Sequence, residues 1–256
     1  MNLVNQKLRT AFFPAFLVCL SVSAGLFFQH KPAEAKVPVI GEVTYLRGES
    51  FRASAGSSNW LPLKVDMKLH EGDRLQTKKS ARIEARLTDG SVVRLGQNTQ
   101  LSLQKVVTNQ KGQRKSVKAK LLLGKIWASV KKAVGAETEF SVTTDHAVAG
   151  VRGTRFETVA SKTGTSVKVY SGAVLVSNKP IYAIKGHTKK KRVQVAGPQL
   201  VSKKKWKELI TGAMQVVKVS SSGAMQAPAA FTMADKSQGD WEAWNAERDA
   251  QAGIHE

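Results

Sequence analysis

The sequence predicts an all-β fold, an antiparallel sandwich or rolled sheet with short helices at its C-terminal end. Residues 81–87 alternate apolar and charged side chains, the period-2 pattern of a strand with one face in water. This strand runs into Asp89-Gly90, a pair suited to a tight hairpin turn, and the alternation resumes at Val93 and Leu95. Short apolar runs separated by Gly, Asp, Asn and Ser continue to about residue 201.

Further strands are expected along the chain at the spacing of an all-β sandwich or rolled sheet. They cover residues 99–103, 121–130, 139–143, 155–159, 166–170 and 173–176. Residues 109–115 (NQKGQRK) are too polar to pack and are expected to form a loop.

The pattern changes after Pro198. Ser202 is suited to capping a helix that ends at Gly212, and the Ser-rich residues 220–223 suggest a mobile linker. A last helix over residues 240–251 would place Trp241, Trp244 and Arg248 on one stripe. We therefore expect three parts, which are a signal peptide (1–35), a β domain (36–200) and a helical and linker tail with an acidic, Trp-containing helix (201–256).

The N-terminal residues predict an export signal. Basic residues without an acid precede an apolar run over residues 11–28, and Ala33-Glu34-Ala35 has the small residues that a signal peptidase reads. Cleavage after Ala35 would give a periplasmic protein with no stable membrane span. The alternative is an uncleaved inner-membrane anchor, because a run of this length lies near the lower limit for crossing a bilayer.

The charge of the chain is strongly positive and unevenly distributed. The 256 residues hold 40 Lys and Arg against 19 Asp and Glu, a formal net charge of +21. Residues 90–136 and 185–207 contain no acid, whereas residues 235–256 are acidic. Such a bias favours attraction to anionic surfaces.

No residue pattern for catalysis, a metal or a cofactor is found. The one cysteine, Cys19, lies inside the N-terminal apolar run, so the rest of the chain has no thiol for a disulfide, a thiolate metal site or a nucleophile. The histidines form no pair at metal-ligand spacing, and the phosphate-cradling, dinucleotide-binding and nucleophile-elbow motifs are absent. We expect no enzyme activity and no cofactor.

Four blocks in a fixed order resemble the FecR domain. Residues 71–103 (EGDRLQTKKSARIEARLTDGSVVRLGQNTQLSL) contain a Gly-Asp pair, a Thr and a hairpin turn at Asp-Gly. The other blocks are LLLGKIWASV at 121–130, FSVTTDHAVAGVRGTRFET at 140–158 and TSVKVYSGAVLVSN at 165–178. The resemblance covers about residues 39–177, and the order of the blocks makes it more specific than any single motif.

The resemblance implies an all-β periplasmic module that recognises another protein and carries no catalytic residues. Well-known members of the family lie in the inner membrane, place an anti-sigma segment in the cytoplasm and receive an iron-uptake signal from an outer-membrane receptor. Only ten residues precede the apolar run in this sequence, so we do not expect that cytoplasmic segment here.

Two kinds of partner are expected, an envelope protein or an anionic envelope polymer or lipid. Strand edges and the Trp-containing helix are the candidate contacts for a protein, and the basic runs are the candidates for a polymer. Nucleic acid is disfavoured by export and by the few aromatic residues near the basic runs. The candidate binding residues are Lys118, Lys120, Lys131, Lys132, Arg152, Arg155, Lys189, Lys190, Lys191, Arg192, Trp241 and Trp244. The basic runs could equally be a solvated surface.

The charge pattern also predicts a contact within the chain. Because the last 22 residues are acidic and the body is basic, the helix carrying Trp241 and Trp244 could fold back onto the sheet. The tryptophans would supply apolar contact and the charges would set the orientation. An anionic ligand could then displace this helix.

Overall fold

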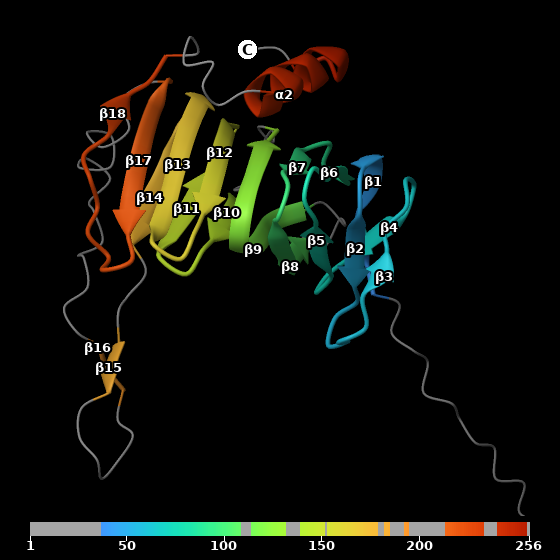
Figure 1. Cartoon of the computed structure of the whole chain (residues 1–256), viewed down its shortest axis with the longest axis horizontal. Coiled ribbons are helices and arrows are strands. Elements are labelled where there is room, and N and C mark those ends of the chain that lie inside the picture. The colour runs from blue at the N-terminus through green and yellow to red at the C-terminus, as the bar shows by residue number, and fades with distance from the viewer. Residues whose placement is uncertain are drawn as a thin grey trace, which may run out of the picture. The chain divides into compact units, whose positions relative to one another are not determined.

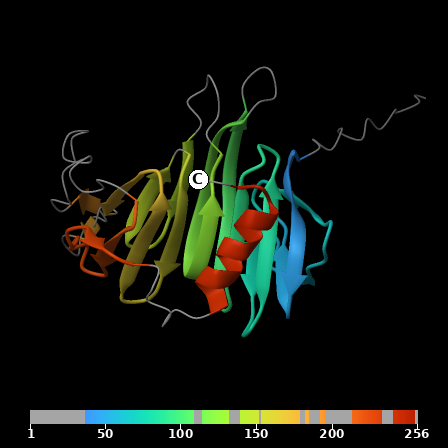
Figure 2. The same cartoon turned by 90° about the horizontal axis from the view of Figure 1, so that it is seen from above.

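The structure is a computed structural model that describes residues 37–108, 114–131, 139–151, 153–178, 182–184, 192–194, 213–232 and 240–254. Its strands form two layers of a mostly antiparallel sandwich, and one helix, α2 (Asp240–Gln251), lies across the outer face of one layer (Figures 1 and 2). Residues 37–256 form one compact unit. The expected signal peptide and the helix expected at 202–212 lie outside the described residues.

The layer that carries the helix, here called the first layer, is an open sheet. In spatial order its strands are β18 (Ala229–Ala230), β17 (Gln215–Ser220), β13 (Gly164–Ser171), β12 (Arg155–Ala160), the end of β9 (Arg114–Ser129), β7 (Val92–Leu95), β6 (Arg82–Leu87), β1 (Val39–Arg47) and β4 (Lys68–His70). All pairs in this layer are antiparallel.

The described strands of the second layer also form an open sheet. Its strands are β3 (Leu61–Pro62), β2 (Ser50–Ala53), β5 (Arg74–Thr77), β8 (Gln100–Thr108), the start of β9, β10 (Glu139–Thr143), β11 (Ala147–Val151) and β14 (Val174–Asn178). Here β10 pairs with β9 in parallel, whereas the other pairs are antiparallel. A separate two-stranded sheet consists of β15 (Tyr182–Ile184) and β16 (Arg192–Gln194).

Strand β9 joins the two layers by bending at Gly124. Residues before the bend pair with β8 and β10, and residues after it pair with β7 and β12. Gly124 has φ +93°, and a Cβ there would lie 2.3 Å from the Thr99 Oγ1. The same Oγ1 accepts a hydrogen bond from the Lys125 N–H at 3.0 Å. Glycine is needed because the backbone takes a left-handed conformation and Thr99 occupies the space of a side chain.

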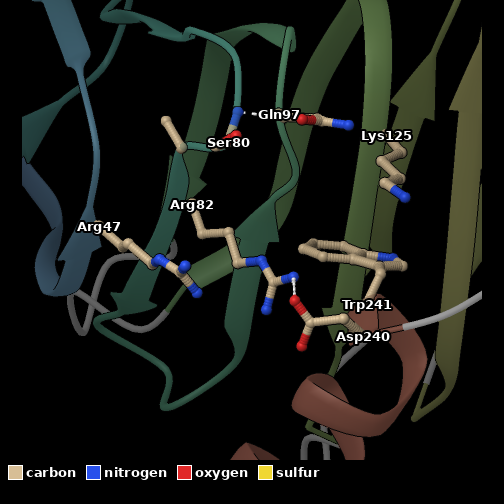
Figure 3. A pocket seen from close by; sticks show the side chains of 8 residues that line it. Arg47, Ser80, Arg82, Gln97, Lys125, Asp240 and Trp241 are labelled. Atoms are coloured by element: carbon tan, nitrogen blue, oxygen red, sulfur yellow. Dashed lines mark hydrogen bonds and ion pairs between the residues drawn. The ribbon is translucent and has the colours of Figure 1, made fainter.

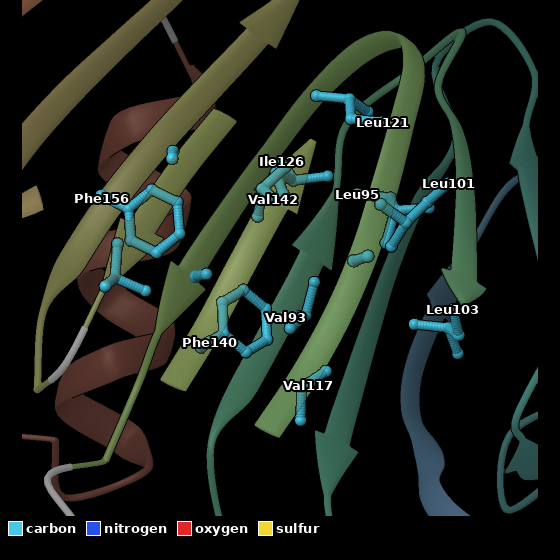
Figure 4. Close-up of a cluster of buried hydrophobic side chains, with 14 of the residues drawn as sticks. Val93, Leu95, Leu101, Leu103, Val117, Leu121, Ile126, Phe140, Val142 and Phe156 are labelled. Atoms are coloured by element: carbon cyan, nitrogen blue, oxygen red, sulfur yellow. The ribbon is translucent and has the colours of Figure 1, made fainter. Parts of the chain in front are cut away.

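The core lies between the layers. Inward-facing side chains of both layers form one buried apolar cluster, which includes Val93, Ile126 and Phe156 of the first layer and Val117 and Phe140 of the second (Figure 4). Phe140 and Phe156 meet edge to face, with ring centroids 6.3 Å apart. The alternation seen in the sequence therefore reflects burial of one face of each strand in a shared core.

The predicted fold class is confirmed, with several strands longer than expected. The hairpin of β6 and β7 turns at Gly90, which has φ +79°, and helix α2 has the expected bounds. Strand β9 begins earlier than the predicted strand at residue 121, because its polar start pairs on both sides in the second layer.

The Ser-rich linker expected at residues 220–223 is instead a turn of the first layer. Strand β17 leads into it and pairs along its length with β13. The Gly223 N–H donates to the Ser220 carbonyl at 3.0 Å, and the Ala224 N–H donates to the Ser220 Oγ at 3.1 Å. Serine hydroxyls thus stabilise a tight turn here, an arrangement that composition alone cannot distinguish from a linker.

Replacement of Gly124 by alanine tests the bend. Gly124→Ala should destabilise the protein by about 3 kcal/mol, because strain at positive φ is added to the clash with Thr99. Gly56→Ala is the matched control, since Gly56 has φ +70° but nothing within 4 Å of its would-be Cβ. The free energy of unfolding of Gly56→Ala should fall by only about 1 kcal/mol. Urea unfolding of both variants measures the difference, and equal losses would contradict the role of Thr99.

Candidate functional site: the sheet face covered by helix α2

Helix α2 covers the outer face of β6, β7, β9, β12 and β13. Asp240 and Glu242 lie in its first turn and Arg248 in its last, where they complement the helix dipole. Trp241, Glu242, Asn245 and Asp249 are buried, at the spacing of one helix face. The alternation of residues 81–87 and 93–95 predicted that their charged side chains face water, and this is wrong where the helix covers Glu84 and Arg94.

Arg94 of β7 lies at the centre of this contact and is 0% exposed. Its Nε donates to Glu84 of β6 at 2.7 Å, and its Nη1 donates to Asp249 of α2 at 2.6 Å and to the Asn245 carbonyl at 3.2 Å. One guanidinium therefore joins two strands to the helix. Its Nη2 has no hydrogen-bond partner among the described residues, so the site is not fully satisfied.

Glu84 is the second bridging group. It accepts hydrogen bonds from Arg94, from Arg248 of α2 at 2.6 Å and from the Thr44 hydroxyl of β1 at 2.7 Å. Burial alone raises the pKa of Glu84, but the hydrogen bonds from Arg248, Arg94 and Thr44 outweigh it and lower the pKa from 4.5 to about 2. Glu84 is thus held in its charged form.

Asp249 ties the end of α2 to β9. Besides Arg94, it accepts hydrogen bonds from the Trp127 Nε1 at 3.1 Å and from the Ser129 hydroxyl at 3.2 Å. Because Asp249 is 1% exposed, these donors replace its hydration. These hydrogen bonds to Asp249 can form only while α2 keeps this position on the sheet. Asp249 therefore fixes the end of the helix.

Glu157 of β12 lies beneath the first turn of α2. The Trp241 Nε1 donates to it at 2.6 Å, and the carboxyl is 2% exposed. Burial raises the pKa of Glu157, and the hydrogen bond from Trp241 and the charges of Lys168 and Lys125 oppose this effect only in part. Unlike Glu84, Glu157 pairs with no arginine among the described residues, so its charge is only partly compensated.

An aromatic cluster extends the contact toward β13. Trp127 and Tyr170 lie 4.2 Å apart between ring centroids, and Trp241 and Trp244 stack at 5.5 Å. The Tyr170 hydroxyl donates to Glu242 at 2.8 Å, and Lys168 pairs with the same carboxylate at 3.0 Å. Burial, followed by the negative charge of Glu157 and the bond to Glu242, raises the pKa of Tyr170. The phenol therefore stays protonated as a donor.

A basic pocket opens beside the first turn of α2 (Figure 3). Its volume is about 290 Å³, and its lining residues are Arg47, Ser80, Ala81, Arg82, Gln97, Lys125, Asp240 and Trp241. The Arg82 guanidinium donates to the Asp240 carboxylate, and its Cζ lies 5.0 Å from the Trp244 ring centroid. The pocket thus lies at the edge of the helix–sheet contact.

The residues singled out in the sequence are not all brought together. Trp241 is buried and Trp244 is partly buried under α2, so neither presents an open surface to a partner. Lys118 and Lys120 lie on β9 in the second layer, where Lys120 pairs with Asp145 at 3.5 Å. Lys131 is exposed after β9.

The remaining candidates contribute less to the described site. The Arg155 Nε donates to the Ser171 hydroxyl at 3.2 Å, which fixes it beside β13. Arg192 lies in β16, and only its backbone is described. Three stretches of the expected binding surface lie outside the described residues, and they hold Lys132, Arg152, Lys189, Lys190 and Lys191.

Sequence reasoning missed the charged residues under the helix, which are Glu84, Arg94, Glu157 and Asp249. Each stands at an outward position of a strand or on the helix, where a charge usually faces water. One signal was present, because Glu84 and Glu157 are isolated acids in strands of a strongly basic chain. The predicted fold-back of the acidic helix onto the sheet is confirmed, although Arg248 also brings a positive charge to Glu84.

The described ranges contain neither a metal-binding cluster nor a membrane-spanning helix. No group of three or more His, Cys, Asp and Glu side chains there could hold a metal ion. Within the same ranges, no helix combines the length and the apolar character needed to cross a bilayer.

Comparison with known proteins identifies a family match within the two layers. Residues 73–175 match the family model described as FecR protein, which confirms the resemblance seen in the sequence. The matched segment runs from β5 into β14 and does not include β17 or α2. The residues of α2 that complete the buried network therefore lie outside the family match.

Two crystal structures of a candidate anti-sigma factor from Parabacteroides distasonis ATCC 8503 are similar to this chain. For each, the sequence identity is 17% and the TM-score is 0.43, and the match covers 64% of this chain and 62% of the other. The chain thus spans less than two thirds of that protein's length. A search of the curated proteins gave no match.

Loss of the Arg94 guanidinium should release α2. Arg94→Met should destabilise the protein by about 3–5 kcal/mol, because the buried Glu84 and Asp249 carboxylates lose their shared counterion. Arg86→Met is the matched control, since Arg86 is exposed on the neighbouring strand, and it should cost less than about 0.5 kcal/mol. Urea unfolding followed by Trp fluorescence measures both, and similar losses would contradict the central role of Arg94.

The two buried glutamates should respond to pH with opposite sign. Because the folded pKa of Glu84 is lowered to about 2, its contribution is complete above pH 4.5 and is lost as the pH falls toward 2. Glu84→Gln should therefore be destabilising at pH 7 by about 3 kcal/mol, and this difference should shrink in acid. Urea unfolding of the parent and of Glu84→Gln at pH 7 and at pH 3 measures this difference in stability.

Glu157→Gln is the contrasting variant. Since burial raises the pKa of Glu157, its ionised form costs stability at neutral pH, and the cost disappears as the pH falls through that pKa. The glutamine keeps an acceptor for Trp241, so this variant should be as stable as the parent or more stable at pH 7. A loss as large as that of Glu84→Gln would contradict this assignment.

Proposed function

We propose that this chain, whose residues 73–175 match the FecR family, is a non-catalytic protein-interaction module of the cell envelope that acts as a scaffold or accessory in signalling. The family match supports a regulatory role exerted through contact with another protein. The expected export signal at residues 1–35 supports a periplasmic location.

The use of the buried titratable groups supports a non-catalytic role. Glu84, Asp249 and Glu242 bind donors that connect α2 to the sheet, and Glu157 binds the Trp241 indole. Catalytic acids and bases instead face a cleft where a substrate can reach them. These charged groups are therefore best explained as parts that hold the helix in place.

Strand β14 is the edge best suited to a protein partner. Of the four terminal strands of the two layers, β14 with 5 residues is the longest, against 3 residues in β4 and 2 each in β3 and β18. It pairs with β11, and no described strand pairs with its other side. Its Leu175 is 41% exposed. An extended segment of a partner could add to such an edge through main-chain hydrogen bonds.

A second candidate function is binding of anionic envelope polymers or lipids through the Lys- and Arg-rich surface. The net charge of +21 and the exposed Lys118 and Lys131 favour it. Such binding would be diffuse and would weaken steeply with salt, because it depends on long-range attraction between exposed charges. A protein partner bound at a strand edge would be retained at high salt.

Crosslinking and capture from intact envelopes at high salt test the proposal. We expect one defined protein to be retained, and Leu175→Lys to reduce its recovery at least several-fold, because a charge on an edge strand blocks strand addition. Leu122→Lys is the matched control, since Leu122 is 40% exposed on the central strand β9, and it should retain the partner. Equal loss in both variants would exclude the β14 edge, and capture only at low salt would favour the polymer-binding alternative.

A further inference from the structure

The basic pocket beside α2 brings together positively charged side chains from three strands. Arg47 of β1 and Arg82 of β6 are directly opposite each other in the antiparallel register. Like charges directly opposite on neighbouring strands are destabilising. Lys125 of β9 adds a third positive charge to the same lining. The close-up shows these side chains, from three strands, around one opening (Figure 3).

The negative charge in this pocket is smaller than the positive charge. Of the described residues that line it, Asp240 alone carries a carboxylate, and it pairs with Arg82. The Asp240 side chain is 76% exposed, so water screens this pair. Three cationic side chains against one carboxylate leave an excess of two positive charges.

Lys125 has the strongest need for a counterion. Among the described residues its Nζ has no hydrogen bond or ion pair, and it lies 5.1 Å from the centre of the Trp241 ring. Burial lowers the pKa of Lys125; the negative charges of Glu157 and Glu242 oppose this effect, and the positive charges of Arg82 and Lys168 add to it. Because no described carboxylate forms an ion pair with this partly buried ammonium, an anion in the pocket would reduce the cost of burying it.

The walls of the pocket are fixed by the backbone. The Gly96 N–H donates to the Lys125 carbonyl at 2.9 Å, and a Cβ on Gly96 would lie 2.7 Å from the Lys125 Cγ. The Ser80 N–H donates to the Gln97 Oε1 at 2.9 Å, so the amide nitrogen of Gln97 is left as a donor at the rim. The Lys125 side chain therefore packs against the backbone of Gly96, where a larger residue would displace it.

We propose that this pocket binds a phosphate group, coordinated by Arg47, Arg82 and Lys125. A phosphate group carries about 1.5 to 2 negative charges at neutral pH, which matches the excess of two positive charges in the lining. Arginine forks and a lysine point charge suit its several oxygens. The group could belong to a phosphorylated sugar of the envelope or be free inorganic phosphate. This site does not depend on the β14 edge or on any protein partner.

Binding at this site would act on the helix. A phosphate that binds Arg82 competes with Asp240, which is the first residue of α2. The bound anion would also lie beside Trp241, whose indole bonds the buried Glu157. Occupancy would therefore loosen the Asp240 pair while it neutralises the charges around Lys125.

Calorimetric titration of the purified chain with inorganic phosphate, glucose 1-phosphate and glucose tests the proposal. We expect both phosphate compounds to bind with one site and glucose not to bind. Tighter binding of glucose 1-phosphate would identify a sugar phosphate as the source, and equal or tighter binding of inorganic phosphate would identify the free ion. Absence of binding by both phosphate compounds would overturn the proposal.

Two pairs of variants distinguish phosphate binding at this pocket from nonspecific attraction of phosphate to the basic chain. Arg47→Gln combined with Lys125→Gln should weaken phosphate binding at least tenfold. Arg86→Gln combined with Lys162→Gln, which removes the same charges from exposed positions elsewhere, should change it less than twofold. Asp240→Asn should tighten binding several-fold, whereas Glu247→Gln on the exposed side of α2 should not. Equal effects within either pair would overturn the assignment to this pocket. Thermal unfolding of each variant without ligand checks that it is folded.

Discussion

The ion network of Glu84, Arg94 and Asp249 fixes α2 on the first layer and thereby shapes the outer face of this sheet. Because Arg94 is fully buried, its charge would strongly destabilise the folded state without the carboxylates of Glu84 and Asp249. Glu84 comes from a neighbouring strand, whereas Asp249 comes from the far end of the chain. The charge on one strand thus requires the helix to stay on the sheet, and the helix in turn shields that charge from water.

This constraint decides which surfaces remain for function. An exposed Trp-containing helix would be a natural contact for a partner, but Trp241 is 4% exposed and its indole is bonded to Glu157. The aromatic side chains stabilise the helix–sheet contact instead. The strand edge at β14 and the basic pocket beside Asp240 lie beside this buried network, and they are the two surfaces for which we propose binding.

Much of the fold was predictable because its signals are local. The alternation of residues 81–87, the Asp89-Gly90 turn and the stripe of Trp241 and Trp244 each depend on residues close together in sequence. Even the return of the helix to the sheet could be inferred from opposite charges. The partners of Arg94 could not, because Asn245 and Asp249 lie more than 150 residues away. The Ser-rich turn was missed for a related reason, since its pairing partner β13 is distant in sequence.

The strand class, the bounds of the last helix, the basic body and acidic tail, and the resemblance to FecR proteins can all be read from the amino-acid sequence, because periodicity, charge and ordered motifs are carried by neighbouring residues. Which charges are buried depends instead on how α2 packs on the sheet. An arginine at an outward strand position looks the same in sequence whether water or a helix covers it, and the difference arises when α2 excludes water and supplies Asp249. The convergence of Arg47, Arg82 and Lys125 is likewise a product of strand register, which brings residues from three strands to one pocket.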